Sequence, residues 1–301
     1  MQDSAKDDGT LSTDLMAKVR QIEIRSRQIV RNRTLGAWHA SFKGMGIEFA
    51  EVREYQEGDD VRAIDWNVSA RAGYPHVKLF TEEREQNVFL LADCTASLDF
   101  GSGPRSKREI LAEIAAVLAF SATLNKDRVG LALHSDHEEL HIAPARGHRH
   151  VLRIIRELLV HRPAATGTDL AGALDELLAT TLKRSIVFIL GDLLTSDFER
   201  PLRALTQRHE VIVLHLTDPM EREMPNLPRF ANLAIEDLEN SRTGHFPARR
   251  REAFADQREN ARRDLTGICR RAAADFLHID TANDYVPALI GLFDARTSRR
   301  T

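Results

Sequence analysis

The fold is decided by the stretch Val88-Phe89-Leu90-Leu91-Ala92-Asp93-Cys94-Thr95-Ala96-Ser97, an apolar run that ends in a polar turn. A short, fully apolar run is typical of a strand that is buried on both faces of a sheet. Downstream, residues 107–125 carry apolar side chains at helical spacing. The stretch therefore predicts a strand, a polar turn and a helix, in that order.

The same alternation continues to the C-terminus. Further strands are expected over residues 129–133, 186–190, 211–216 and 276–279, and helices over residues 151–160, 170–182, 198–208 and 285–293. Residues 139–142 can pair beside 129–133 through a polar turn. This order predicts an α/β fold, an open and mainly parallel sheet with helices on both faces.

The N-terminal part of the chain differs from this pattern. Residues 1–12 are polar and predict a disordered tail, and a helical period begins at Ser12 and ends near Arg33. Residues 36–85 are dense in glycine, charge and aromatic side chains, with a short strand-like alternation over residues 74–80. We therefore divide the chain into a tail (1–12), an N-terminal helix with this mixed segment (13–85), and the α/β domain (86–301).

Composition narrows the class of protein. The 301 residues include 42 Lys and Arg against 45 Asp and Glu, a net charge of −3, which favours neither a nucleic-acid binder nor a membrane-surface binder. Only two cysteines occur, Cys94 and Cys269, and they fit free thiols in a reducing compartment. Neither a signal pattern nor a membrane-spanning apolar run is found, so a cytoplasmic location is expected.

Oxygen-bearing side chains cluster where ligands gather in such sheets, at the carboxyl ends of the strands. Asp93, Thr95 and Ser97 follow the first strand, Thr168 precedes a helix, and Asp192 follows residues 186–190. Carboxylates and hydroxyls with few formal charges suit Mg²⁺ or another hard divalent cation such as Mn²⁺. The alternative is that these polar turns only cap helices.

This set of residues resembles a von Willebrand factor type A domain. The family's metal-ion-dependent adhesion site has an Asp-x-Ser-x-Ser turn, a threonine on a second loop and an aspartate on a third. The resemblance implies that Asp93, Thr95, Ser97, Thr168 and Asp192 are the metal residues. Thr95 stands where the family usually has serine, so the hydroxyl is kept and a methyl group is added.

The segment before the domain resembles the domain-of-unknown-function-58 family. The residues that carry this resemblance are Gly46 to Phe49, Arg53 to Tyr55, Gly58 to Trp66, Ser69 to Arg71, Val77, Lys78, Glu82 and Glu83. The chain looks like a short branch of that family, without the transmembrane helices of longer relatives. Charged side chains of the segment could pin it across the sheet edge or onto the core. Alternatively they form a partner-binding surface next to the metal; the candidates are Arg53, Asp59, Arg62, Asp65, Trp66 and Arg71.

The resemblance implies a binding module rather than an enzyme. Family members are typically encoded beside MoxR-type AAA+ ATPases and other von Willebrand A proteins, and are thought to act as adaptors in chaperone-like assembly or metal insertion. We therefore expect a cytosolic, metal-dependent protein-interaction adaptor with such an ATPase as its partner. Two alternatives stay open, a Mg²⁺-dependent phosphoester hydrolase and a scaffold that binds no metal.

Other sites have less support in the sequence. Five histidines, His134, His137, His141, His148 and His150, lie on a strand-turn-strand segment and beyond it, where alternating directions prevent all of them from converging on a transition metal. Cys94 is expected to point into the core as an inert thiol. Residues 242–271 carry nine arginines against four acidic residues and predict a basic, solvated helix.

Overall fold

A six-stranded sheet forms the centre of the molecule. The computed structural model describes residues 4–31, 35–42, 47–82, 85–164, 167–181, 183–193, 197–228, 231–237 and 242–300. The strand order is β10-β7-β6-β3-β4-β5. Their bounds are β3 (Asn87–Asp93), β4 (Arg128–His134), β5 (Glu138–Ala145), β6 (Ser185–Gly191), β7 (Glu210–Thr217) and β10 (Asp275–Asp280). Only β5 runs antiparallel to its neighbour, so the predicted open, mainly parallel sheet is confirmed.

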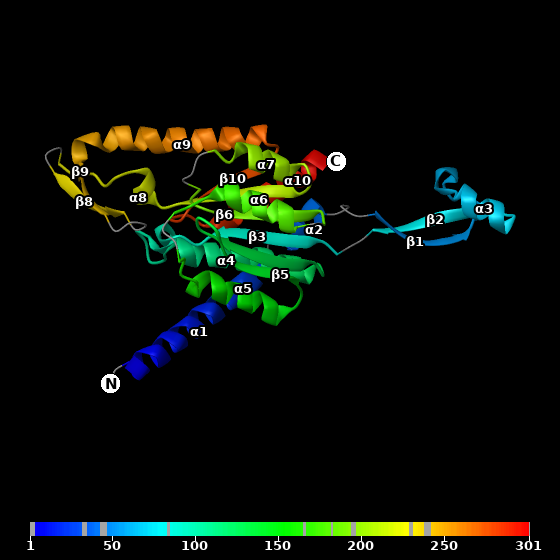
Figure 1. Cartoon of the computed structure of the whole chain (residues 1–301), viewed down its shortest axis with the longest axis horizontal. Helices are drawn as coiled ribbons and strands as arrows, with labels where there is room; N and C mark the ends of the chain where they lie inside the picture. The colour runs from blue at the N-terminus through cyan, green and yellow to red at the C-terminus, as the bar shows by residue number, and fades with distance from the viewer. Residues whose placement is uncertain are drawn as a thin grey trace.

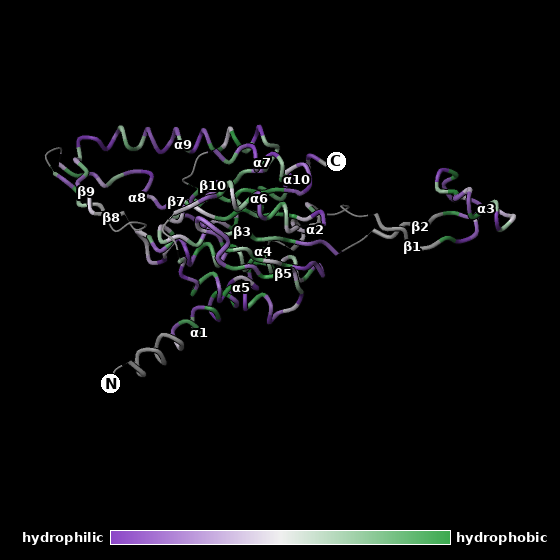
Figure 2. The backbone as a smooth tube through the Cα atoms, viewed as in Figure 1, coloured by the Kyte–Doolittle hydropathy of each residue, from purple (hydrophilic) through white to green (hydrophobic). Residues whose placement is uncertain are grey.

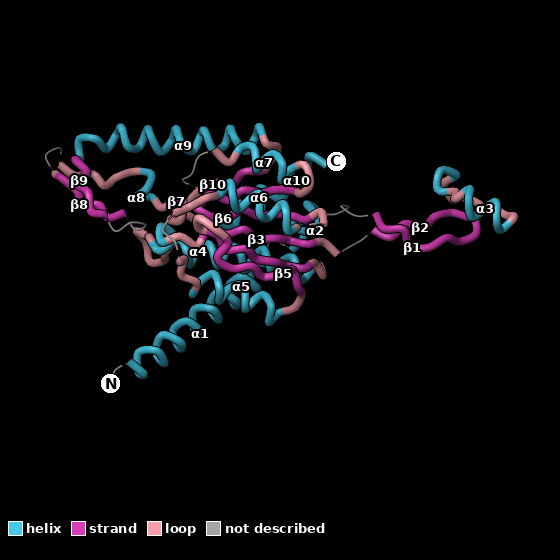
Figure 3. The backbone as a smooth tube through the Cα atoms, viewed as in Figure 1, coloured by secondary structure: helices cyan, strands magenta, loops and turns pink. Residues whose placement is uncertain are grey.

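Helices cover both faces of this sheet (Figure 3). One face carries α1 (Ser4–Ile29), α2 (Leu35–Phe42), α4 (Lys107–Leu124), α5 (His148–Val160) and α10 (Tyr285–Arg300), and the other carries α6 (Leu170–Thr180), α7 (Glu199–Thr206) and α9 (Arg251–Arg271). Alternate residues of β3 supply both cores: Leu90 packs on the first face and Leu91 on the second. The central strands are accordingly largely hydrophobic (Figure 2).

Three regions differ from the sequence-based expectation. Helix α1 begins at Ser4, not Ser12, and residues 4–12 are therefore helical rather than a tail; the stretch contains no proline to stop a helix. The basic helix expected over 242–271 begins only at Arg251, because residues 242–247 form β9 (Arg242–Pro247), which pairs with β8 (Asn232–Asp237). Helix α2 and the short helix α8 (Pro219–Arg222) were not anticipated.

Residues 47–82 form a separate hairpin that we call the arm. Strands β1 (Ile47–Glu54) and β2 (His76–Glu82) pair antiparallel in a sheet of their own, and they carry η2 (Val61–Ala63) and α3 (Trp66–Ala72) between them. Figure 1 shows the arm standing away from the body of the molecule. The expectation that this segment lies across the sheet edge or onto the core is therefore wrong.

Several charged residues of the arm make hydrogen bonds within the arm itself. Arg53 donates two hydrogen bonds to the carboxylate of Asp59, at 2.8 and 2.7 Å. The Asp65 carboxylate caps α3 by accepting from the backbone N–H groups of Asn67 and Val68. These side chains shape the arm itself, while Trp66 remains 69% exposed.

An aromatic cluster fixes α2 and α10 on the sheet. Trp38 lies 4.7 Å from Phe42, 5.8 Å from Phe188 and 5.6 Å from Phe293, measured between ring centroids. Trp38 is only 1% exposed and is one of the largest fully buried side chains. The cluster joins an N-terminal helix, a central strand and the C-terminal helix, which are far apart in sequence.

A buried carboxylate joins the helices of the same face. Glu113 of α4 accepts a hydrogen bond from the Tyr285 hydroxyl at 2.7 Å, and it forms ion pairs with Arg25 at 2.9 Å and Arg105 at 2.7 Å. Burial, and then the charge of Glu113, raise the pKa of Tyr285, which stays protonated and donates. The network ties α1, α4 and α10 together.

No helix within the described residues combines the length and the apolar character that crossing a lipid bilayer would need.

The two tryptophans provide a matched test of the body and the arm. We expect Trp38→Ala to lower the free energy of unfolding by about 3–5 kcal/mol, because it leaves a cavity among packed rings. Trp66→Ala should change it by less than about 0.5 kcal/mol, because that side chain is exposed. Urea unfolding followed by circular dichroism measures both values. Equal losses in the two variants would contradict this description of the core.

Candidate functional site

The candidate site lies where β3 and β6 end side by side. Ala92 of β3 is paired with Leu190 of β6 in parallel register, so Asp93 and Asp192 emerge together at the carboxyl edge of the sheet. From β3 the chain continues to β4 on one side, while β6 lies on its other side. Such a reversal of strand order opens a crevice at the strand ends, which is where open α/β sheets bind ligands.

A chain of hydrogen bonds connects four of the five predicted metal residues. The backbone N–H of Thr95 donates to Asp93 Oδ1 at 2.8 Å. The hydroxyls of Thr95 and Ser97 are 3.0 Å apart, and the Ser97 hydroxyl donates to Asp192 Oδ2 at 2.7 Å. The one-turn helix η3 (Ala96–Asp99) places Ser97 for this contact. The structure thus brings Asp93, Thr95, Ser97 and Asp192 into one cluster.

Thr168 joins the cluster from the loop before α6. It lines a cavity of about 20 Å³ together with Asp93 and His134, a space of roughly the size of one water molecule. The backbone N–H of Asp169 donates to the carbonyl of Ser135 at 2.8 Å and holds the loop beside the end of β4. All five predicted residues therefore lie together.

Sequence reasoning missed a buried cation in the site. Lys107, the first residue of α4, is fully buried, and its ammonium lies 3.1 Å from Asp192 Oδ2 and 2.5 Å from Glu221 Oε1. Burial alone lowers the pKa of Lys107, but the carboxylates of Asp192 and Glu221 outweigh it and hold that pKa above its ordinary value. A cation at a helix N-terminus is repelled by the helix dipole. The position of Lys107 at the start of a predicted helix was therefore the one sequence signal that this lysine needs acidic partners.

The two aspartates are in different electrostatic states. Asp192 has the ammonium of Lys107 and the hydroxyl of Ser97. Burial, and then the negative charge of Asp192, raise the pKa of Asp93 to about 7. Among the described residues Asp93 Oδ2 is buried and has no hydrogen-bond partner. The site therefore offers one carboxylate oxygen that is neither solvated nor paired.

These residues fit a hard divalent cation. The donors are carboxylate and hydroxyl oxygens, and the unpartnered Asp93 Oδ2 is the oxygen that a cation would satisfy. Gly191 permits the close approach of the strand ends, because a Cβ there would lie 2.8 Å from Asp93 Cβ. Lys107 already neutralises part of the acidic charge. Whether the five residues hold Mg²⁺ remains a prediction.

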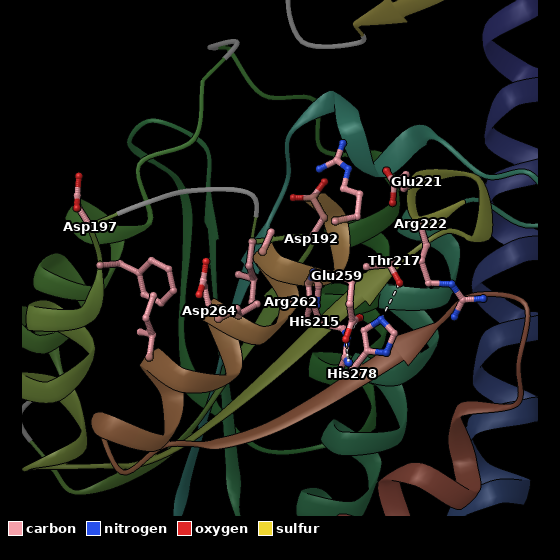
Figure 4. A pocket seen from close by; sticks show the side chains of 16 residues that line it. Asp192, Asp197, His215, Thr217, Glu221, Arg222, Glu259, Arg262, Asp264 and His278 are labelled. Atoms are coloured by element: carbon pink, nitrogen blue, oxygen red, sulfur yellow. Dashed lines mark hydrogen bonds and ion pairs between the residues drawn. The ribbon is translucent and has the colours of Figure 1, made fainter. Parts of the chain in front are cut away.

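A larger cavity opens beside the site, under α9. We call it the α9 cavity; its volume is about 590 Å³, and its walls come from α8, α9, the ends of β7 and β10, and the chain after β6 (Figure 4). Asp192 lines both this cavity and the metal cluster, and His215, Thr217 and His278 line the side formed by the strands. Burial, and then the neighbouring His278, lower the pKa of His215 to about 4, so its imidazole is neutral near pH 7.

The other candidate residues do not join the site. Within the described parts of the chain, no group of three or more His, Cys, Asp or Glu side chains is placed to hold a metal, which argues against the histidine alternative. Cys94 and Cys269 are buried free thiols, as predicted. Burial, and then Asp93, raise the pKa of Cys94 to about 12, so it is not a nucleophile. The candidate partner-binding residues, Arg53 to Arg71, lie on the arm and not next to the metal cluster (Figure 1).

Removal of the buried ammonium tests the charge balance of the site. In EDTA, Lys107→Met should lower the free energy of unfolding by about 3–5 kcal/mol, because Asp192 and Glu221 are left as buried or half-buried charges without their cation. Lys107→Arg keeps the charge and serves as the control. A loss below about 1 kcal/mol for Lys107→Met in urea unfolding would contradict the assigned role of this lysine.

The raised pKa of Asp93 makes the effect of Mg²⁺ depend on pH. The folded protein keeps the Asp93 proton up to about pH 7 while the unfolded chain loses it near 3.8. This proton therefore contributes stability that is complete below 3.8 and is lost as the pH rises through about 7. We expect Mg²⁺ to raise the melting temperature more at pH 8 than at pH 5, because the cation and the proton compete for Asp93. Asp93→Asn should abolish the difference; an equal Mg²⁺ effect at both pH values would refute it.

The chain matches the family described as "Protein of unknown function DUF58" over residues 51–264. An uncharacterized protein of Mycobacterium tuberculosis is 32% identical over 289 residues, which are 94% of this chain and 90% of that protein. YeaD of Bacillus subtilis is 30% identical over 149 residues, 49% of this chain and 35% of that protein.

Two solved structures are similar at low sequence identity. BatB from Bacteroides thetaiotaomicron is 13% identical with a TM-score of 0.46, and the match covers 71% of this chain and 99% of that one. The SpRpn10 VWA domain is 13% identical with a TM-score of 0.38, covering 70% of this chain and 94% of that one. The family match spans most of the chain, including much of the arm and the strand-end site: this chain belongs to the DUF58 family.

Proposed function

We propose that this chain is a cytosolic, magnesium-dependent protein-interaction adaptor that takes an acidic side chain of its partner at the strand-end site. One observation carries the proposal: Asp93 Oδ2 is buried and unpartnered beside two hydroxyls and a second carboxylate. Such an oxygen is costly to bury unless a cation or a proton satisfies it. A bound cation balances the charge of the site, and its open coordination position accepts an oxygen ligand from a partner.

Each residue of the site has a distinct part in this proposal. Asp93 and Asp192 supply the negative charge, directly or through water, and the hydroxyls of Thr95, Ser97 and Thr168 supply neutral oxygens. A magnesium ion bound there supplies Lewis acidity toward one further oxygen ligand. Lys107 limits the net charge of the site, and this favours a carboxylate from a partner as that ligand.

The partner in this proposal comes from the resemblance described above. It is a MoxR-type AAA+ ATPase, with other von Willebrand A proteins as further partners, in chaperone-like assembly or metal insertion. The arm is the second contact surface, through Arg53, Asp59, Arg62, Asp65, Trp66 and Arg71. In support, Trp66 is 69% exposed on a hairpin that reaches away from the body.

A metal-free scaffold is the second candidate. It is favoured by the ion pair between Lys107 and Asp192, in which a protein ammonium already neutralises one of the two aspartates. The hydrolase alternative has less support, because Lys107 is held between two carboxylates and is poorly placed to donate a proton to a leaving group.

Metal-dependent capture tests the proposal. A tagged chain incubated with native lysate in Mg²⁺ should retain an AAA+ ATPase, and EDTA should release it. Asp93→Ala should weaken the interaction at least about tenfold, because one missing charged ligand costs roughly 1.4 kcal/mol or more. Asp175→Ala, an exposed aspartate of α6, is the matched control. Equal retention by the Asp93→Ala chain, or equal retention in EDTA, would refute metal-dependent binding.

A further inference from the structure

The α9 cavity and the strand-end site share a residue, Asp192. The Asp192 carboxylate accepts a hydrogen bond from the Ser97 hydroxyl in the metal cluster, and the same side chain lines the cavity. Glu221, the second partner of Lys107, lines the cavity as well. An acidic side chain that reaches the cluster would therefore bring its neighbouring residues close to this cavity, whose lining side chains are drawn in Figure 4.

Part of the cavity wall is apolar. Leu193 and Phe198, from the chain after β6, and Leu265 and Ile268, from α9, line it together. At about 590 Å³ the cavity lies within the range of protein ligand pockets and exceeds what one aromatic side chain needs. A wall of this kind favours a large apolar group.

The three arginines that line the cavity already have partners within the protein, which argues against an anionic ligand. Arg262 donates two hydrogen bonds to Glu259, both at 2.8 Å. Arg222 forms an ion pair with Asp280 at 3.0 Å, and the guanidinium of Arg258 lies 5.1 Å from the ring centroid of Phe254. A free anion would have to compete with these internal contacts, whereas an apolar group would not.

Two histidines and a threonine line the strand side of the cavity. His215 is 5% exposed, and its Nδ1 is buried with no hydrogen-bond partner among the described residues. Its neighbours are engaged, since Thr217 Oγ1 and His278 Nε2 are 2.8 Å apart. The polar atoms on this side are therefore buried or engaged with each other, and they do not favour a polar ligand over an apolar one.

We propose that the α9 cavity is a specificity pocket for a partner peptide, taking the large apolar side chain next to the acidic residue that the strand-end site binds. This inference rests on the proposed function and names its partner class: a segment in which a carboxylate is flanked by phenylalanine or a similar residue. In this proposal the metal cluster binds the carboxylate of the peptide, and the cavity binds the apolar side chain next to it.

Three blocked peptides and the full chain test the pocket by isothermal titration in Mg²⁺ and in EDTA. One carries aspartate between two phenylalanines, one aspartate between two glycines, and one asparagine between two phenylalanines. In Mg²⁺ the first should bind at least about tenfold more tightly than the second, because a buried aromatic side chain contributes that much. The third should bind weakly, because it lacks the carboxylate.

Two alanines of α9 give matched variants. Ala261 lines the cavity and Ala253 does not, and both are exposed. Ala261→Trp should fill the mouth and reduce the advantage of phenylalanine to less than about threefold, while leaving the glycine-flanked peptide unaffected. Ala253→Trp should keep the full advantage.

The outcomes separate this inference from the proposed function. The pocket is overturned if the phenylalanine and glycine peptides bind equally, or if the tighter binding of the phenylalanine peptide survives Ala261→Trp. In either case, EDTA-sensitive binding of the glycine peptide still supports the metal site. Binding of the phenylalanine peptide that is lost in Ala261→Trp but unchanged in EDTA supports the pocket and refutes the metal. If no peptide binds, both are refuted.

Discussion

Two carboxylates converge at the carboxyl edge of the sheet, and the rest of the site is arranged around their mutual repulsion. Asp93 and Asp192 are adjacent because β3 and β6 are parallel neighbours in register. Two features of the site reduce this repulsion. Lys107 is buried against Asp192. Burial, and then the negative charge of Asp192, raise the pKa of Asp93 to about 7, so that Asp93 takes up a proton, or a cation in its place.

The fold separates this site from the arm. The body buries its own core on both faces of the sheet, with Trp38 and Glu113 joining the helices of one face. The arm is held by its own hairpin pairing and by local pairs such as Arg53 with Asp59. The contacts described for the arm are therefore local, and this agrees with the proposal that the arm is a second contact surface.

The sequence predicted the sheet and the position of the candidate site because both depend on short-range patterns. Apolar runs mark the buried strands, and residues such as Asp93 and Asp192 follow them directly, so parallel pairing brings them together. Lys107 could not be assigned this way, because its partner Asp192 is 85 positions away and its burial depends on tertiary packing. The α9 cavity could not be predicted from the sequence for the same reason, because the residues that line it are far apart along the chain. The arm was misplaced because its charges suggested long-range ion pairs, whereas Asp59 pairs with the nearby Arg53 and Asp65 caps α3 through backbone N–H groups.

A crystal structure of the chain grown with Mn²⁺, with data collected at the manganese absorption edge, tests the central claim most directly. The account predicts an anomalous peak within coordination distance of Asp93 Oδ2 and the Ser97 hydroxyl, with the Lys107 ammonium still beside Asp192 and Glu221. The absence of a peak at saturating Mn²⁺, with Asp93 Oδ2 left unpartnered or protonated, would contradict it and leave Lys107 as the resident cation of a metal-free scaffold.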